Sequence, residues 1–167
     1  MHRALTCFTL ISLLLAGTFV RVALAGADSI PRAEDLSRLA AESKQRRIPI
    51  LLVVSQYHCG YCERMKQEVL LPMQLSGDYV DRVLMRELMI DPGETVIDFA
   101  GKREDAAAFA ARYKVNVTPT LLFLAPDGTE AAERIRGINT VDYLLFYIEQ
   151  AIDAATEQMN SRTTASR

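Results

Sequence analysis

The stretch Ile50-Leu51-Leu52-Val53-Val54-Ser55, followed shortly by Cys59-Gly60-Tyr61-Cys62, decides the fold of this 167-residue chain. The first part is a continuous apolar run with the length of a buried β-strand. After the second cysteine, residues 63–71 carry apolar side chains at helical spacing. The two cysteines are therefore predicted to lie where a buried strand leads into a helix.

This placement favours thiol chemistry at the cysteine pair. The first turn of a helix has unpaired N–H groups and the positive end of the helix dipole. A thiol there ionises more easily, and the thiolate is the nucleophile in disulfide exchange. Two intervening residues bring Cys59 and Cys62 close enough to form a disulfide. We expect Cys59 to be exposed at the helix tip and Cys62, one turn further, to be shielded.

The N-terminal 25 residues have the pattern of a secretory signal peptide. A basic head, Met1-His2-Arg3, precedes an apolar run and the small-residue cleavage site Ala23-Leu24-Ala25. The alternative is an uncleaved membrane anchor, but the apolar run is short for a membrane span. We therefore predict a signal peptide over 1–25, a domain over 26–159 and a flexible tail over 160–167. The mature protein would be periplasmic or secreted, without stable membrane insertion.

Cleavage also changes the charge and cysteine content. Lys and Arg fall from 19 to 17 against 21 Asp and Glu, which gives a net charge of −4. This balance does not favour nucleic acid or an anionic membrane as partner. Cys7 is removed, so only Cys59 and Cys62 remain. Because so short a loop constrains the unfolded chain little, the pair is expected to serve chemistry rather than stability.

The remaining chain alternates between helical and strand patterns, which predicts one α/β domain. The sheet is expected to be mixed, with about four strands and helices on both faces. Beside strand 50–55, the predicted elements are a helix over 29–47, the active-site helix to about Leu71 where Pro72 ends or kinks it, a strand over 82–90, a connection over 94–102, a helix over 105–114, strands over 120–125 and 131–136, and a helix over 140–159.

Three features together resemble the thioredoxin superfamily. They are the strand–CxxC–helix, the later Thr118-Pro119 that opens a strand, and a hairpin followed by a terminal helix. More narrowly, residues 32–156 resemble the exported thioredoxin-related proteins of the SoxW type. The stretches that carry this narrower resemblance run from His58 to Met65, from Val96 to Lys102 and from Phe109 to Val115. The resemblance implies a thioredoxin fold with a cis Pro119 packed against the CxxC pair, where neighbouring backbone binds the substrate chain.

The chain departs from thioredoxins at several positions. It has no tryptophan, and His58 replaces the aromatic residue that usually precedes the first cysteine. Val53 stands where thioredoxins bury an aspartate, and Glu87 stands where they bury a lysine. No clear counterpart of the first strand precedes residue 32. These departures leave the disulfide chemistry in place but change its proton-transfer route.

Several residues around the cysteines are candidates for substrate binding, each with a simpler alternative. A protonated His58 would stabilise a Cys59 thiolate, or it is an exposed loop residue. Gly60 and Tyr61 would shape the docking surface, or Tyr61 merely covers the helix tip. Thr118 would form a hydrogen bond near the thiols, or it is extended backbone before Pro119.

Glu87 is the candidate proton acceptor for Cys62. Alternation along strand 82–90 places it on the face that carries Val83, Met85 and Met89. Desolvation favours the protonated form of a carboxyl group, which suits a base that works near neutrality. The alternative is that Glu87 pairs with an arginine or bends toward solvent.

These features predict an exported thiol–disulfide oxidoreductase that acts on protein disulfides or dithiols. Cys59 would attack a partner disulfide and Cys62 would resolve the mixed disulfide. No organic or metal cofactor is implied, and a membrane-embedded thiol reductant is the expected electron donor. One alternative is a carrier that holds Cu(I) or another thiophilic metal with His58 and the two cysteines. A second alternative is an adaptor that docks partners without turnover.

Overall fold

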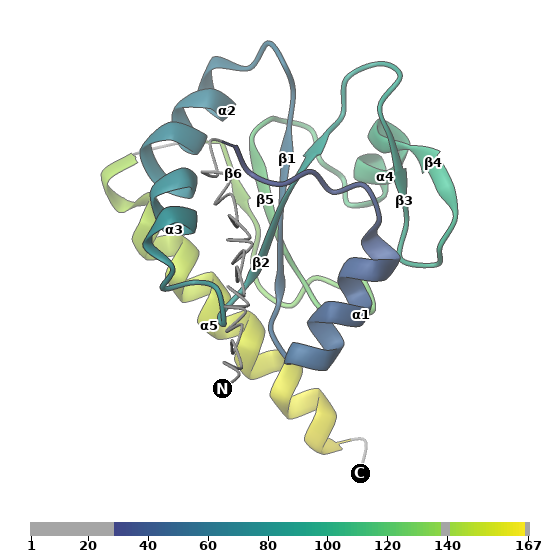
Figure 1. Cartoon of the computed structure of the whole chain (residues 1–167), viewed down its shortest axis with the longest axis vertical. Helices are drawn as coiled ribbons and strands as arrows, with labels where there is room; N and C mark the ends of the chain where they lie inside the picture. Colours follow the sequence, from purple (N-terminus) through teal and green to yellow (C-terminus); the bar gives the residue numbers. More distant parts are fainter. Residues whose placement is uncertain (1–28, 138–140, 166–167) are drawn as a thin grey trace, which may run out of the picture.

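Strand β1 (Ile50–Ser55) lies inside a four-stranded mixed sheet of order β2–β1–β5–β6 (Figure 1). In this computed structural model, which describes residues 29–137 and 141–165, β2 (Leu84–Met89) is parallel to β1 and β5 (Thr120–Leu124) is antiparallel. β6 (Ile135–Arg136) completes the far edge. The predicted α/β fold is confirmed, whereas the proposed signal peptide and Cys7 lie outside the described residues.

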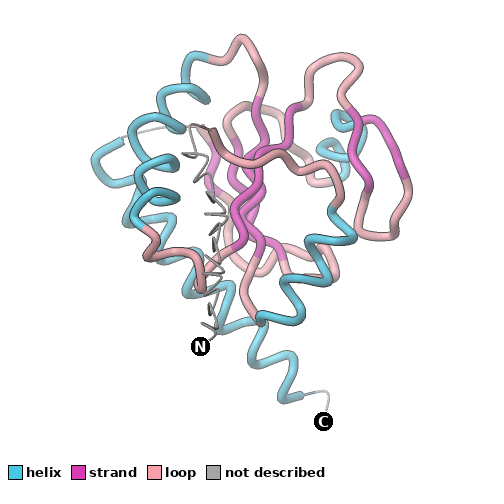
Figure 2. Tube along the Cα trace, in the orientation of Figure 1, coloured by secondary structure: helices cyan, strands magenta, loops and turns pink. Residues whose placement is uncertain are grey.

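Helices cover both faces of the sheet, as Figures 1 and 2 show. One face carries α2 (Gly60–Met65), the π-helical segment η1 (Lys66–Leu70), α3 (Leu71–Ser76) and α5 (Val141–Ala165). The other carries α1 (Leu36–Arg46) and α4 (Ala106–Arg112). Every β1 residue is buried because alternate side chains enter the two separate cores.

The helical run after the cysteines is longer than predicted. Pro72 does not end it, and α3 continues to Ser76. Proline lacks an N–H group and is tolerated in the first turn of a helix. Here the π-helical η1 precedes it and Pro72 falls in the first turn of α3. The α-helix therefore resumes at Leu71, and Pro72 is accommodated where a missing N–H group is tolerated.

The first helix begins later than predicted, at Leu36 instead of residue 29. Asp35 caps it by accepting a hydrogen bond from the Arg38 amide. The residues before the cap are extended and pair with the outer edge of β2. The Glu87 amide donates to the Pro31 carbonyl, and the Ala33 amide donates to the Glu87 carbonyl. This short pairing supplies the edge segment for which the sequence shows no clear counterpart.

The predicted connection over 94–102 contains strand β3 (Thr95–Ile97), which forms a hairpin with β4 (Arg103–Asp105). The Asp98 carboxylate closes the turn by accepting hydrogen bonds from the Ala100 and Lys102 amides. The Lys102 amide is the main reason that the pKa of Asp98 lies below its usual value. These strands have three residues each, so alternation alone could not reveal them.

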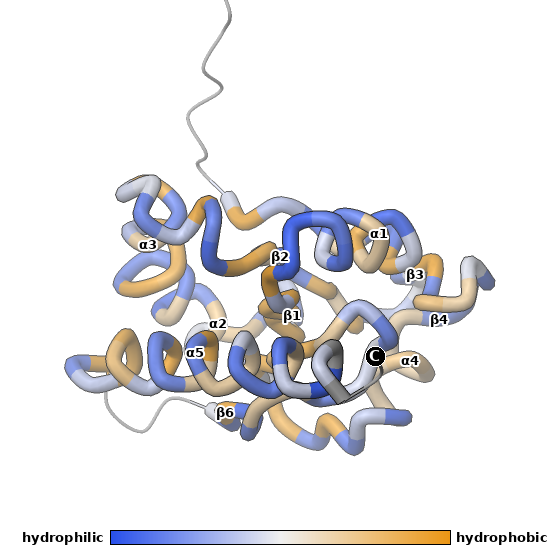
Figure 3. The backbone as a smooth tube through the Cα atoms, turned by 90° about the horizontal axis from the view of Figure 1, so that it is seen from below, coloured by the Kyte–Doolittle hydropathy of each residue, from blue (hydrophilic) through white to orange (hydrophobic). Residues whose placement is uncertain are grey.

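The C-terminal part also differs in its boundaries. The predicted strand over 131–136 is reduced to β6, with a single bridge between Leu124 and Glu130 before it. α5 extends to Ala165, so helix enters the stretch that was expected to be a tail. Figure 3 shows hydrophobic residues along β1 and β2 and a mixed pattern along α5. No helix in the described part of the chain is both long enough and apolar enough to cross a membrane.

Candidate active site

Cys59 and Cys62 form a disulfide at the start of α2, with their Cα atoms 5.2 Å apart. Cys59 is the N-cap residue, so its backbone is extended and its side chain lies beside the first helical turn. The Cys62 amide points at the Cys59 Sγ atom, 3.1 Å away. The first turn of α2 thus presents a backbone N–H donor to the sulfur atom of Cys59.

The two cysteines have different exposure. Cys62 is only 2% exposed, whereas Cys59 is partly exposed. The expected contrast between the two sulfurs is therefore confirmed. His58, Gly60 and Tyr61 surround Cys59 and are all exposed. His58 makes no hydrogen bond or ion pair with the described residues, so its action on the Cys59 thiolate stays a prediction.

The Thr118–Pro119 peptide bond is cis, as predicted, and Pro119 is buried. The Thr118 hydroxyl donates to the Gln56 side-chain oxygen, 3.1 Å away. Gln56 lies in the loop that joins β1 to the cysteines, so this bond connects the proline loop to the cysteine loop. Beside them, Val117 is 46% exposed.

Tyr57 provides a second set of contacts that hold the loop before Cys59. The Tyr57 amide donates to the Asp91 carboxylate, and its hydroxyl donates to Glu94. The hydrogen bond to Glu94 raises the pKa of Tyr57 above its usual value. Glu94 also pairs with Arg32 at 2.8 Å, and the Arg32 guanidinium lies 5.8 Å from the centre of the Tyr57 ring. The residues before Cys59 are thus fixed from both sides.

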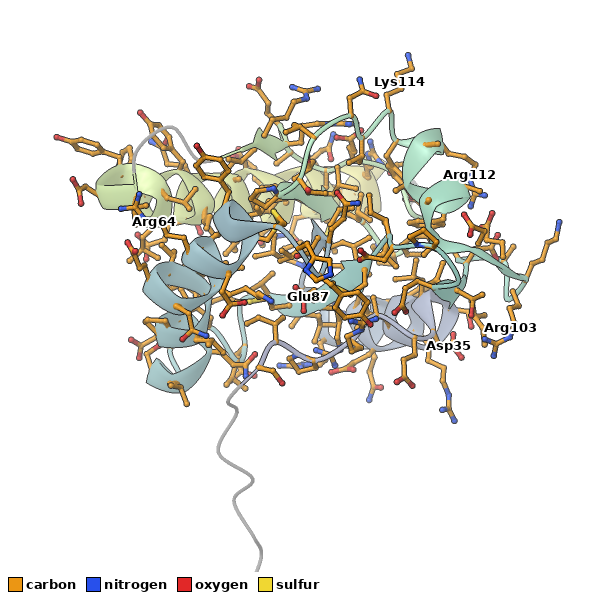
Figure 4. The ribbon with its side chains drawn as sticks, turned by 90° about the horizontal axis from the view of Figure 1, so that it is seen from above. Asp35, Arg64, Glu87, Arg103, Arg112 and Lys114 are labelled. Carbon is orange, nitrogen blue, oxygen red and sulfur yellow. A yellow bond between two sulfur atoms is a disulfide. The ribbon has the colours of Figure 1, made fainter. Side chains whose placement is uncertain are left out.

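Glu87 is buried beneath the helical run that contains the cysteines. It is 5% exposed and pairs in register with Val53 of β1. Its strand neighbours Val83 and Met85 belong to the core under α2, η1 and α3, as the alternation predicted. In Figure 4, Glu87 lies near the middle of the molecule, whereas Arg103 extends from the rim of the molecule.

The partner of Glu87 is a lysine rather than an arginine. Glu87 Oε1 has no well-aligned hydrogen-bond donor among the described residues, but Lys66 Nζ lies 3.2 Å away. Lys66 Nζ also lies 3.1 Å from the Glu63 carboxylate. Burial lowers the pKa of Lys66, but the Glu63 hydrogen bond and the charge of Glu87 outweigh this and raise it. Lys66 is therefore held as a cation between two carboxylates.

Sequence reasoning missed Lys66, Gln56 and Tyr57. For Lys66 a local indication existed, because it follows Cys62 by four residues and so lies on the same helical face. The contacts of Gln56 and Tyr57 connect loops far apart in the sequence, which local patterns do not reveal. Among residues 29–137 and 141–165, no group of three or more His, Cys, Asp or Glu side chains is arranged to hold a metal ion.

With this geometry in view, the comparisons with known proteins identify the class. The model of the thioredoxin-like domain family matches residues 36–152. This match covers more than half of the chain and includes the disulfide and the cis proline. The chain therefore belongs to the thioredoxin-like domain family and carries a CxxC disulfide. No curated protein matches it.

Solved structures show the same fold at low identity. A DsbH oxidoreductase is 19% identical, with a TM-score of 0.57 over 83% of this chain and 95% of that one. A thioredoxin from Thermus thermophilus is 22% identical, with a TM-score of 0.54 over 73% and 87% of the two chains. Mitochondrial thioredoxin 3 from Saccharomyces cerevisiae is 19% identical, with a TM-score of 0.51 over 77% and 98%. These likenesses establish the thioredoxin fold.

Proposed function

We propose that this protein is an exported thiol–disulfide oxidoreductase, of the SoxW-like type, that reduces or exchanges protein disulfides. The observation that carries the proposal is the Cys59–Cys62 disulfide, whose two sulfurs differ in exposure. An accessible cysteine can meet a partner disulfide, and a buried neighbour can resolve the resulting bond without competing for substrate.

The first step is attack by the Cys59 thiolate on a disulfide of the partner. The new bond joins Cys59 to one partner sulfur, and the other partner sulfur leaves as a thiolate. The Cys62 amide, 3.1 Å from Cys59 Sγ, supports this step by donating to the thiolate. No cation lies on Gly60 or Tyr61, which favours a reductant over a strongly oxidising protein.

The second step releases the reduced partner. Cys62 loses its proton and attacks Cys59, which breaks the mixed disulfide and forms the Cys59–Cys62 bond again. Because Cys62 is buried, its thiol does not readily lose a proton to solvent. We assign Glu87 as the acceptor of that proton, since it is buried under the same helical run and Val53 beside it cannot act as a base.

The docking surface comprises the residues around Cys59 and the cis proline. His58, Gly60 and Tyr61 come from the cysteine loop and helix tip, and Thr118 and Pro119 come from the proline loop. The hydrogen bond between Thr118 and Gln56 holds the two loops together. An extended partner segment can then lie beside residues 118–119 while its cysteine reaches Cys59.

The cellular setting follows from the leader pattern in residues 1–25. An exported dithiol protein needs a source of electrons, because each turnover leaves its cysteines oxidised. A membrane-embedded thiol reductant is the partner that would restore the dithiol by exchange. The electron pair passes between sulfur atoms throughout, so the reaction requires no organic or metal cofactor.

Disulfide turnover and trapping test the proposal. The mature domain should reduce insulin disulfides in the presence of dithiothreitol, and Cys59→Ser should abolish this activity. Cys62→Ser should accumulate mixed disulfides through Cys59 because the resolving sulfur is absent, and Cys59→Ser should trap little. Equal trapping by both variants would contradict the assigned roles. A wild-type domain that binds Cu(I) tightly but reduces no disulfide would instead support the metal-carrier alternative.

A further inference from the structure

Lys66 connects the cysteine helix to the buried carboxylate. It follows Cys62 by one helical turn and begins η1, where its amide donates to the Cys62 and Glu63 carbonyls. Its side chain crosses from the helix to β2 and ends 3.2 Å from Glu87 Oε1. A residue of the cysteine helix thus contacts the group that we assign as the base.

Lys66 is the cation that compensates the charge of Glu87. No other ion pair to Glu87 occurs in the part of the chain that the structure describes. The two arginines adjacent to Glu87 in the sheet are engaged elsewhere. Arg86, next on the strand, donates to the Met85 carbonyl, and Arg32, which bridges to Glu87 at the sheet edge, pairs with Glu94. On the helix side, Glu63 faces Lys66 and competes for the same ammonium group.

A buried carboxylate without a countercharge takes up a proton, because burial penalises its charged form. A protonated Glu87 could not accept a proton from Cys62. The ionised form that catalysis needs therefore depends on the nearby ammonium group. Lys66 is itself kept charged, since its pKa is raised by Glu63 and Glu87 in spite of burial.

We infer that Lys66 is a positioning residue that keeps Glu87 ionised and so sets the pH range over which Cys62 resolves the mixed disulfide. The inference rests on the proposed function, because it needs Glu87 to act as the base. It adds a residue that touches neither substrate nor the reacting sulfur atoms. Its effect is transmitted through an ion pair between η1 and β2.

The resolution rate as a function of pH tests this role. Reduced protein is mixed with Ellman's reagent, and the second release of thionitrobenzoate reports the attack of Cys62 on Cys59. Lys66→Met should move the midpoint of the pH profile upward by about one unit or more, from below to above neutrality, which slows the step about tenfold at pH values below both midpoints. Lys66→Arg keeps the positive charge and should restore most of the rate. Lys66→Gln offers a second neutral variant.

Two controls separate an effect through Glu87 from other effects. Arg64 is an exposed cation of the same helical run, and it pairs with Glu68 rather than with Glu87. Arg64→Met should therefore leave the midpoint of the pH profile unchanged. In a Glu87→Gln background, Lys66→Met should add no further slowing. An equal shift in both backgrounds, an equal shift by Arg64→Met, or no shift in Lys66→Met would overturn the inference. His58 is present in every variant, so its contribution is the same on both sides of each comparison.

A second measurement does not depend on turnover. The ¹³C resonance of the Glu87 carboxyl group in the oxidised protein should report the ionised form near neutrality and the protonated form in Lys66→Met. An ionised Glu87 in Lys66→Met at that pH would also overturn the inference. If wild-type protein fails to turn over disulfides, the proposed function fails. If wild-type protein is active but Lys66→Met behaves identically, only the role of Lys66 fails.

Discussion

Cys59 and Cys62 have the same side chain but differ in solvent exposure, because they occupy different positions in one helical turn. Cys59 is the N-cap residue, so it lies outside the helix and close to solvent. Cys62 lies inside the first turn, where the chain has rotated toward the sheet, and it is buried. In the proposed function, this spacing of three residues assigns attack to the accessible cysteine and resolution to the buried one.

Alkylation should distinguish the two cysteines. When the reduced protein is treated with iodoacetamide near neutral pH, Cys59 should be modified before Cys62, because it is accessible and its thiolate has an amide donor. Peptide mass spectrometry at successive times measures the order. Cys59→Ser provides the control, since Cys62 alone should react slowly. Faster modification of Cys62 would reverse the assigned roles.

At the scale of the elements, the turns of two hairpins illustrate two different reasons why a position requires glycine. Gly128, in the turn between β5 and β6, has φ +81°, and a Cβ there would lie 2.8 Å from Phe99. Gly101, in the turn between β3 and β4, has the same φ but open space around it. Phe99 is packed against Phe109 of α4, so its ring cannot move away freely. Gly101 is therefore required only by its backbone conformation, whereas Gly128 is required both by its backbone conformation and by the nearby Phe99 ring.

Gly128→Ala should destabilise the domain more than Gly101→Ala. Each variant places a side chain in a left-handed backbone conformation, which costs about 1–2 kcal/mol. Gly128→Ala also forces the new methyl group against Phe99, so its total cost should approach about 3 kcal/mol. Urea unfolding at equilibrium gives both values. Equal losses in the two variants would show that the Phe99 contact costs nothing.

At the scale of the whole molecule, two partly buried tyrosines join distant parts of the fold. The Tyr113 hydroxyl, after α4, donates to the Gly128 carbonyl at 2.7 Å. The Tyr79 hydroxyl, after α3, donates to Glu149 of α5 at 2.6 Å. Burial is the main cause that raises the pKa of each tyrosine to about 12. Both hydroxyl groups therefore stay protonated in the folded protein at pH values where they would ionise in an unfolded chain.

This difference between the folded and unfolded pKa values predicts that the folded protein loses stability at alkaline pH. The folded pKa values lie above the unfolded value of 10.0, so the stabilisation is present below pH 10 and is lost as pH rises toward about 12. The free energy of unfolding, measured in urea at several pH values, should fall over this interval. Tyr113→Phe removes one of the groups that ionise over this interval, so its stability should fall less steeply with pH. A slope equal to that of the wild type would exclude Tyr113 as a contributor.

The sequence by itself determined the features that depend on local periodicity. The buried strand, the cysteine pair at a helix start and the later Thr118–Pro119 were sufficient to predict the fold and the place of the cysteine pair in it. Alternation along β2 also placed Glu87 correctly on the face beneath the cysteine helix. These predictions succeeded because side-chain direction repeats regularly along a strand or helix.

Only the tertiary structure decided which distant groups meet. Lys66 and Glu87 lie on different elements, and their ion pair depends on how η1 packs on β2. The start of α1 depends similarly on Pro31 and Ala33, because their backbone pairs with the edge of β2 instead of entering the helix. Such contacts arise from packing between segments far apart in the chain, and no local pattern encodes the distance between them.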